Sequence, residues 1–97
     1  MPEKKARPRS QRVYGKDFVE AASRLGLNLT DTRRVWKQVI QHLKGDPTRN
    51  TEDALADYAT YGQLQDLRDA DSRPVKGLND PLWELFKTVA QEFVAEL

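Results

Sequence analysis

The segment from Thr30 to Lys44 reads TDTRRVWKQVIQHLK, and its apolar residues recur at the spacing of an α-helix. Thr30 is a favourable N-cap residue, and Gly45 followed by Pro47 predicts the end of the helix. The residues predicted to face a core are Val35, Trp36, Val39, Ile40 and Leu43. The opposite side carries basic and amide side chains, and no acid occurs between Asp31 and Asp46. A solvated helix normally mixes charges to gain i,i+4 pairs, so this uniform sign indicates an anionic partner.

Three further helices are predicted around this segment, over residues 17–25, 50–70 and 80–97. Gly26 ends the first, Asn50 or Thr51 caps the second, and Asp80 caps the last, with Pro81 in its first turn. A turn of helix is also expected around Ser10 to Tyr14. Residues 71–79 read as a loop, and no strand-like alternation is present. The predicted fold is all-α, a small bundle of about four helices.

The charge is divided between the two halves of the chain. Up to Arg49 there are 12 lysines and arginines against 5 acids, and from Asn50 onward there are 4 against 10. Residues 1–12 contain two prolines and offer almost nothing apolar to bury, so they predict a flexible, disordered basic N-terminal arm. Residues 13–97 predict a single helical domain, with a basic half over 13–49 and an acidic half over 50–97.

Composition excludes several classes of protein. The chain of 97 residues lacks cysteine, so disulfides and cysteine-based zinc sites are excluded. It has no apolar run of membrane-spanning length and no secretory leader, so we expect an intracellular protein of the cytoplasm or nucleoid. His42 is the single histidine, without a second metal ligand or a nucleophile at useful spacing. We therefore expect no enzyme activity, no catalytic residue, and no metal, cofactor or small-molecule ligand.

The stretch from Phe18 to Lys44 resembles helix-turn-helix DNA-binding proteins. Ala22 is followed four residues later by the turn glycine Gly26, with Leu25 and Leu27 on either side and Val35 in the second helix. The sequence departs from the family at Thr32, where an apolar residue is common. The resemblance implies that Thr30 to Lys44 is a recognition helix in the major groove of duplex DNA.

The residues expected to contact DNA combine the arm, the start of the first helix and the polar side of the second. Arginine pairs well with guanine, and Gln38 is suited to adenine, whereas lysines contact phosphates. The arm is expected in a minor groove or along the backbone. The full set is Lys4, Lys5, Arg7, Arg9, Arg12, Lys16, Thr30, Arg33, Arg34, Lys37, Gln38, Gln41 and Lys44.

The leading interpretation is a small DNA-binding protein of regulator or accessory type, acting in transcription regulation. RNA is an alternative nucleic acid, because basic arms discriminate poorly between the sugars. A second class is a protein-interaction module, such as a small phage- or plasmid-type factor, that binds a host protein through the acidic half. Asp57, Asp66 and Asp69 would then carry the function. The wide apolar stripe of the last helix also raises the prospect of a homodimer.

Overall fold

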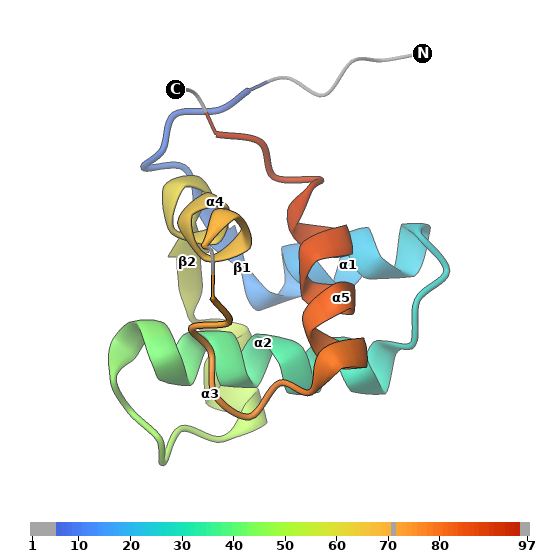
Figure 1. The fold of residues 1–97 in the computed structure, drawn as a ribbon, viewed down its shortest axis with the longest axis vertical. Helices are drawn as coiled ribbons and strands as arrows, with labels where there is room; N and C mark the ends of the chain where they lie inside the picture. Colours follow the sequence, from blue (N-terminus) through green and yellow to red (C-terminus); the bar gives the residue numbers. More distant parts are fainter. Residues whose placement is uncertain (1–5, 71, 96–97) are drawn as a thin grey trace.

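The computed structural model describes residues 6–70 and 72–95, and this part of the chain is mostly helical (Figure 1). Its elements in order are β1 (Arg12–Tyr14), α1 (Gly15–Arg24), α2 (Leu29–Lys44), α3 (Thr51–Ala56), β2 (Tyr58–Thr60), α4 (Tyr61–Asp69) and α5 (Asp80–Ala90). In Figure 1, α5 stands upright between α4 and α1, with α2 and α3 beneath them. The fold class is therefore largely helical, but a two-stranded sheet makes it not purely all-α.

The core is built on α2, which packs against α1, α3 and α5. Val35, Trp36, Val39 and Ile40 are fully buried, as the helical spacing predicted. The Phe18 ring of α1 lies 5.0 Å from the Trp36 ring, measured between centroids. Trp36 is fully buried, as predicted, and Trp83 of α5 is almost fully buried.

Two predicted helix caps are wrong by one or two residues. Asn28, not Thr30, caps α2, because its side chain accepts a hydrogen bond from the Asp31 amide. Asn79 rather than Asp80 caps α5 in the same way. In both cases asparagine supplies the oxygen one turn ahead of the amide that needs it. The predicted cap at Asn50 is confirmed by its bond with the Asp53 amide.

The predicted helix over residues 50–70 is wrong, because the chain breaks it into α3, β2 and α4. Residues Tyr58–Thr60 pair antiparallel with β1, with Val13 opposite Ala59. Both of these residues are buried, so the strand pair closes one side of the core. The Thr60 hydroxyl and the Gln63 side chain form a capping box that starts a new helix. The same pairing replaces the helical turn expected around Ser10 to Tyr14 with a strand.

The described part of the N-terminal arm, Ala6 to Arg12, lies against the domain, contrary to the predicted flexible arm. The Arg7 amide donates to the Val94 carbonyl, and the Gly62 amide donates to the Arg9 carbonyl. Figure 1 shows this segment crossing beside the chain that follows α5. The arm is held by backbone hydrogen bonds, which do not require apolar side chains. Composition therefore gave no sign of it.

The apolar stripe of the last helix is used inside the chain. Its members Phe86 and Val89 are fully buried, and Leu85 packs partly buried against the core. The regular helix ends at Ala90, short of the predicted end. Most of the described stripe thus packs in the protein's own core, and a homodimer stays a prediction. Among the described residues, the exposed large apolar side chains are instead Leu25 and Leu29. No described helix is long and apolar enough to cross a membrane.

Candidate nucleic-acid interface

The N-terminal half of α2 presents a shallow basic hollow. Asn28 fixes where the helix begins, and Thr30, Arg33, Arg34 and Lys37 then fall on the side that faces away from the core. With Thr51 at the start of α3, these residues line a hollow of about 320 Å³. Both arginines are exposed and Lys37 is half-buried. Because the apolar residues of α2 are buried on one side, its basic residues face solvent on the other.

A second hollow adjoins the first and shares Arg33 with it. It has a volume of about 410 Å³ and lies between α1, α2 and α3. Lys16, in the first turn of α1, lines it, together with apolar Val19 and Leu29. Glu20 is the acid in its lining, and this carboxylate is paired with Arg24 at 3.2 Å. Positive charge therefore continues from α2 across to α1.

We call Lys16, Thr30, Arg33, Arg34 and Lys37 the α2 cationic face. None of its four charged side chains forms an ion pair with any residue that the structure describes. Most other described basic side chains do have an acidic partner, for example Arg9 and Arg68. This face is therefore a cluster of cations without internal neutralisation, and it attracts anions.

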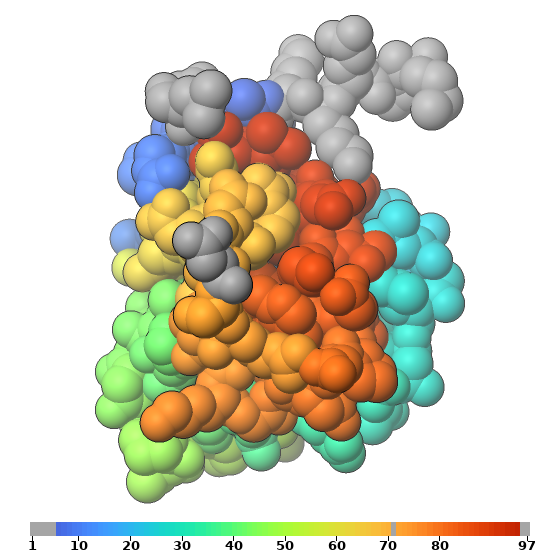
Figure 2. All heavy atoms as spheres, viewed as in Figure 1, coloured from blue at the N-terminus to red at the C-terminus, as the bar shows by residue number. Residues whose placement is uncertain are grey.

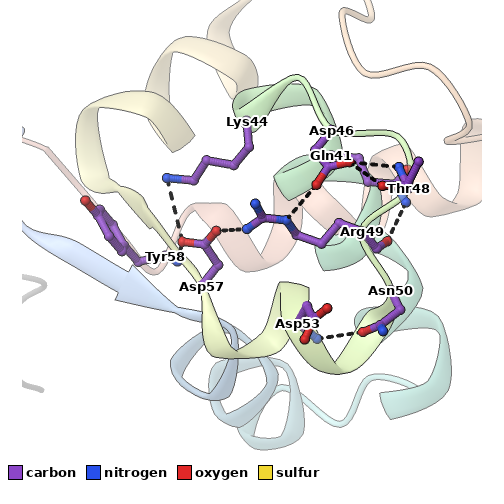
Figure 3. Close-up of polar contacts among 9 residues, drawn as sticks. All are labelled: Gln41, Lys44, Asp46, Thr48, Arg49, Asn50, Asp53, Asp57 and Tyr58. Carbon is purple, nitrogen blue, oxygen red and sulfur yellow. Dashed lines mark hydrogen bonds and ion pairs between the residues drawn. The ribbon is translucent and has the colours of Figure 1, made fainter.

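The C-terminal half of α2 is engaged within the fold, although the sequence placed it in the DNA-binding set. Lys44 lies 3.7 Å from the Asp57 carboxylate and 4.4 Å from the centroid of the Tyr58 ring. The Gln41 side-chain amide donates to the Arg49 carbonyl at 2.8 Å. Gln38 lies against Gly77 of the loop before α5. Figure 3 shows Lys44 and Gln41 in this polar network. These three residues lie away from the cationic hollow of α2.

The polar network around Arg49 holds the turn between α2 and α3 (Figure 3). Arg49 pairs with Asp57 and also approaches Asp46 at 3.6 Å. The Thr48 hydroxyl donates to the Asp46 carboxylate and, with the Thr48 backbone amide, lowers the pKa of Asp46 below its ordinary value. The network stabilises the turn and involves no residue of the α2 cationic face.

The arm residues lie on another side of the molecule. Arg9 pairs with Asp66 of α4 at 2.8 Å. The Arg12 guanidinium lies 4.4 Å from the centroid of the Tyr58 ring, and its hydrogen bond to the Tyr14 hydroxyl raises the pKa of Arg12. Arg7 is exposed beside the end of the chain. Lys4 and Lys5 lie outside the described residues. The structure thus does not bring the described arm residues together with Arg33 and Arg34.

The acids assigned to the protein-interaction alternative are paired within the chain. Asp57 contacts Arg49 and Lys44, and Asp66 contacts Arg9. Asp69 contacts its neighbour Arg68 at 3.1 Å. Asp57 is mostly buried by its contacts, whereas Asp66 and Asp69 are exposed but each has a basic neighbour in the chain. No group of three potential metal ligands occurs among the residues described.

Comparison with known proteins identified no relative of this chain. No protein-family model, no curated protein and no solved structure matches the chain. The helix-turn-helix resemblance stays a prediction. Thr32, the departure from that family, is fully buried and donates its hydroxyl to the Asn28 carbonyl at 2.7 Å. A polar residue is tolerated at this core position because its one donor is satisfied locally.

Sequence reasoning missed Thr51 as part of the cationic hollow, and it missed a larger hollow beside Gln38. Thr51 follows a helix cap, and nothing in its local pattern indicates that α3 would lie along α2. The larger hollow depends on Lys76 and Gly77 folding back onto α2. Val75 and Leu78 flank these two residues and are buried. Two apolar residues three apart within a polar loop were the available signal that this loop packs on the domain.

Proposed function

We propose that this protein binds nucleic acid through the α2 cationic face. The observation that carries the proposal is the set of four cations, Lys16, Arg33, Arg34 and Lys37, that lack an acidic partner among the described residues. They lie around two adjoining hollows that share Arg33. A polyphosphate backbone supplies negative charges at regular intervals, and it is the commonest partner for such a surface.

The chemistry of the side chains fits phosphate. Arginine presents a planar fork of donors that bonds two phosphate oxygens, and lysine supplies a compact charge. The hydroxyls of Thr30 and Thr51 stand in the same hollow and can donate to phosphate oxygens. Each neutralised phosphate releases counterions, which drives binding at low salt. Use of this surface in transcription regulation, and a preference for duplex DNA, stay predictions.

The protein-interaction alternative has less support in the fold. Its three acids, Asp57, Asp66 and Asp69, each have a basic partner in the same chain. A partner protein would have to compete with these internal pairs. The α2 cationic face has no such competition, so we favour nucleic acid.

Amide chemical shifts recorded while a mixed-sequence DNA duplex is added test the proposal residue by residue. We expect the largest changes at Lys16 and at Thr30 to Lys37. The amides of α4 should change little, because Arg68 on this helix is paired with Asp69, and Arg9 beside it is paired with Asp66. Changes concentrated on α4 or α5, or no change at low salt with either this duplex or a single strand, would overturn the proposal.

A further inference from the structure

A third hollow, larger than the two beside the cationic face, lies further along α2. It has a volume of about 570 Å³ and opens between the C-terminal half of α2 and the loop before α5. Figure 2 shows this loop, in orange, against the green atoms of α2 and the turn that follows it. The residues lining it are Gln38, Gln41, His42, Gly45, Pro47, Pro74, Lys76 and Gly77. None of them is acidic, so the hollow suits an anionic or neutral ligand.

Apolar walls alternate with polar groups in this hollow, since four of its eight lining residues carry polar side chains. Pro47 and Pro74 contribute apolar pyrrolidine rings from two different segments. Gly77 has a φ of +90°, and a Cβ there would lie 2.7 Å from the Gln38 Oε1 atom. The positive φ favours glycine here, whereas the Gln38 side-chain end could shift to relieve the contact. The loop is itself held in place, because Val75 and Leu78 are buried on either side.

The polar groups offer both donors and acceptors. The structure gives the Gln38 amide and the His42 imidazole no hydrogen bond with any described residue. Gln41 donates to the Arg49 carbonyl through its nitrogen, which leaves its side-chain oxygen available. Lys76 is exposed and forms no ion pair within the described chain. An amide, an imidazole and an ammonium around apolar walls match a nucleotide, whose base has apolar faces and a polar edge.

The hollow and the cationic face lie one after the other along the same helix, α2. Arg34 and Lys37 line the basic hollow, and Gln38 and Gln41 line this one. From Arg34 to Gln41 the helix rises by about 10 Å, a distance that a few nucleotides of a single strand span. A strand whose phosphates contact Arg34 and Lys37 therefore passes the mouth of this hollow.

We propose that the hollow between α2 and the loop before α5 holds an unpaired base of the nucleic-acid strand bound on the α2 cationic face. This inference rests on the proposed function and narrows its partner to a single strand, or to a duplex that contains unpaired nucleotides. A base inside a regular duplex is stacked on both faces and reaches such a hollow only if it is extruded. Gln38 and His42 contact the base edge or face, and Lys76 contacts a neighbouring phosphate.

Fluorescence anisotropy with two labelled probes tests the inference, using an oligodeoxythymidine and a mixed-sequence duplex with the same number of phosphates. We expect the unmodified protein to bind the single strand more tightly. The double variant Gln38→Ala/His42→Ala should lose about fivefold in affinity for the single strand, the low end of what one base contact contributes. Its affinity for the duplex should not change.

Arg34→Ala is the matched control. Both probes carry phosphates that Arg34 can contact, so this substitution should lower the affinity for both. If the double variant binds both probes as the unmodified protein does, or loses equally on both, the inference is overturned while nucleic-acid binding stands. If the unmodified protein binds neither probe at low salt, the proposed function falls and this inference falls with it. Circular-dichroism melting of each variant confirms that the fold is retained.

Discussion

The indole nitrogen of Trp36 donates a hydrogen bond of 2.7 Å to the backbone carbonyl of Ala54, and both residues are fully buried. This contact ties the middle of α2 to α3. It fixes how α2 is rotated about its own axis, and so which of its sides reaches solvent. The outward position of Arg33 and Arg34 is a consequence of this buried contact.

Trp36→Phe tests the buried contact. The substitution removes the donor and part of the ring, and it leaves the Ala54 carbonyl without its partner. We expect the free energy of unfolding to fall by about 3 kcal/mol, from the lost hydrogen bond and the smaller ring together. Urea denaturation measures it. Trp83→Phe is the control, because Trp83 is almost as buried but its indole bonds to no described residue. An equal loss in both variants would show that the hydrogen bond adds nothing.

Gly15→Ala tests the packing between α1 and α3. An added Cβ would lie 2.5 Å from the Leu55 Cα atom and 2.8 Å from the Trp36 indole nitrogen. Backbone cannot yield as a flexible side chain can, so we expect a loss of about 3 kcal/mol in stability. Gly26→Ala serves for comparison, because Gly26 has a φ of +75° but open space around it. It should cost only about 1 kcal/mol, from backbone strain. Thermal melting measures both losses of stability. A larger loss for Gly26→Ala than for Gly15→Ala would contradict the close packing at Gly15.

Strong local signals explain what could be predicted from the sequence. The core side of α2 follows from apolar spacing, and the C-terminal end of α1 follows from Gly26, although α1 begins two residues before the predicted start. The strand pair could not be found, because Val13 opposite Ala59 is a long-range contact between two segments of three residues each. The hollow beside Gln38 could not be predicted either, because it forms between α2 and a loop that lies more than thirty residues after Gln38 in the sequence. The positive side of α2 was predicted. The contacts of Lys44 and Gln41 were not, because their partners Asp57, Tyr58 and Arg49 come after the helix ends.

Lys44 and Lys37 stand on the same helix but should respond differently to removal. Lys44→Ala breaks its contacts with Asp57 and the Tyr58 ring, and we expect the free energy of unfolding to fall by about 1 kcal/mol. Lys37→Ala should leave stability unchanged within about 0.5 kcal/mol, because Lys37 has no such contact. Denaturation with urea gives the stabilities, and anisotropy gives DNA affinity. If Lys44→Ala reduced affinity more than Lys37→Ala did, the division of α2 into two functional halves would be wrong.

Hydrogen exchange tests whether the described arm is held on the domain. The amides of Arg7 and Gly62 donate to Val94 and Arg9 carbonyls, so both should exchange more slowly than an unfolded chain does. The Ser10 amide, for which the structure gives no backbone acceptor, is an internal reference. Deleting residues 1–10 should then speed exchange at Gly62. If the Arg7 and Gly62 amides exchanged as fast as the Ser10 amide, the result would instead support the flexible arm expected from composition.

The measurement that tests the central claim most directly is DNA affinity across a salt series, for the unmodified protein and for Arg33→Ala/Arg34→Ala/Lys37→Ala. If Lys16 and the three substituted cations each neutralise a phosphate, the logarithm of affinity should fall against the logarithm of salt with a slope of about −3 to −4. The triple variant should bind weakly, with a slope of about −1. Lys87→Ala, which removes a lysine paired with Glu84 on α5, should match the unmodified protein. Equal slopes for the triple variant and the unmodified protein would contradict the account.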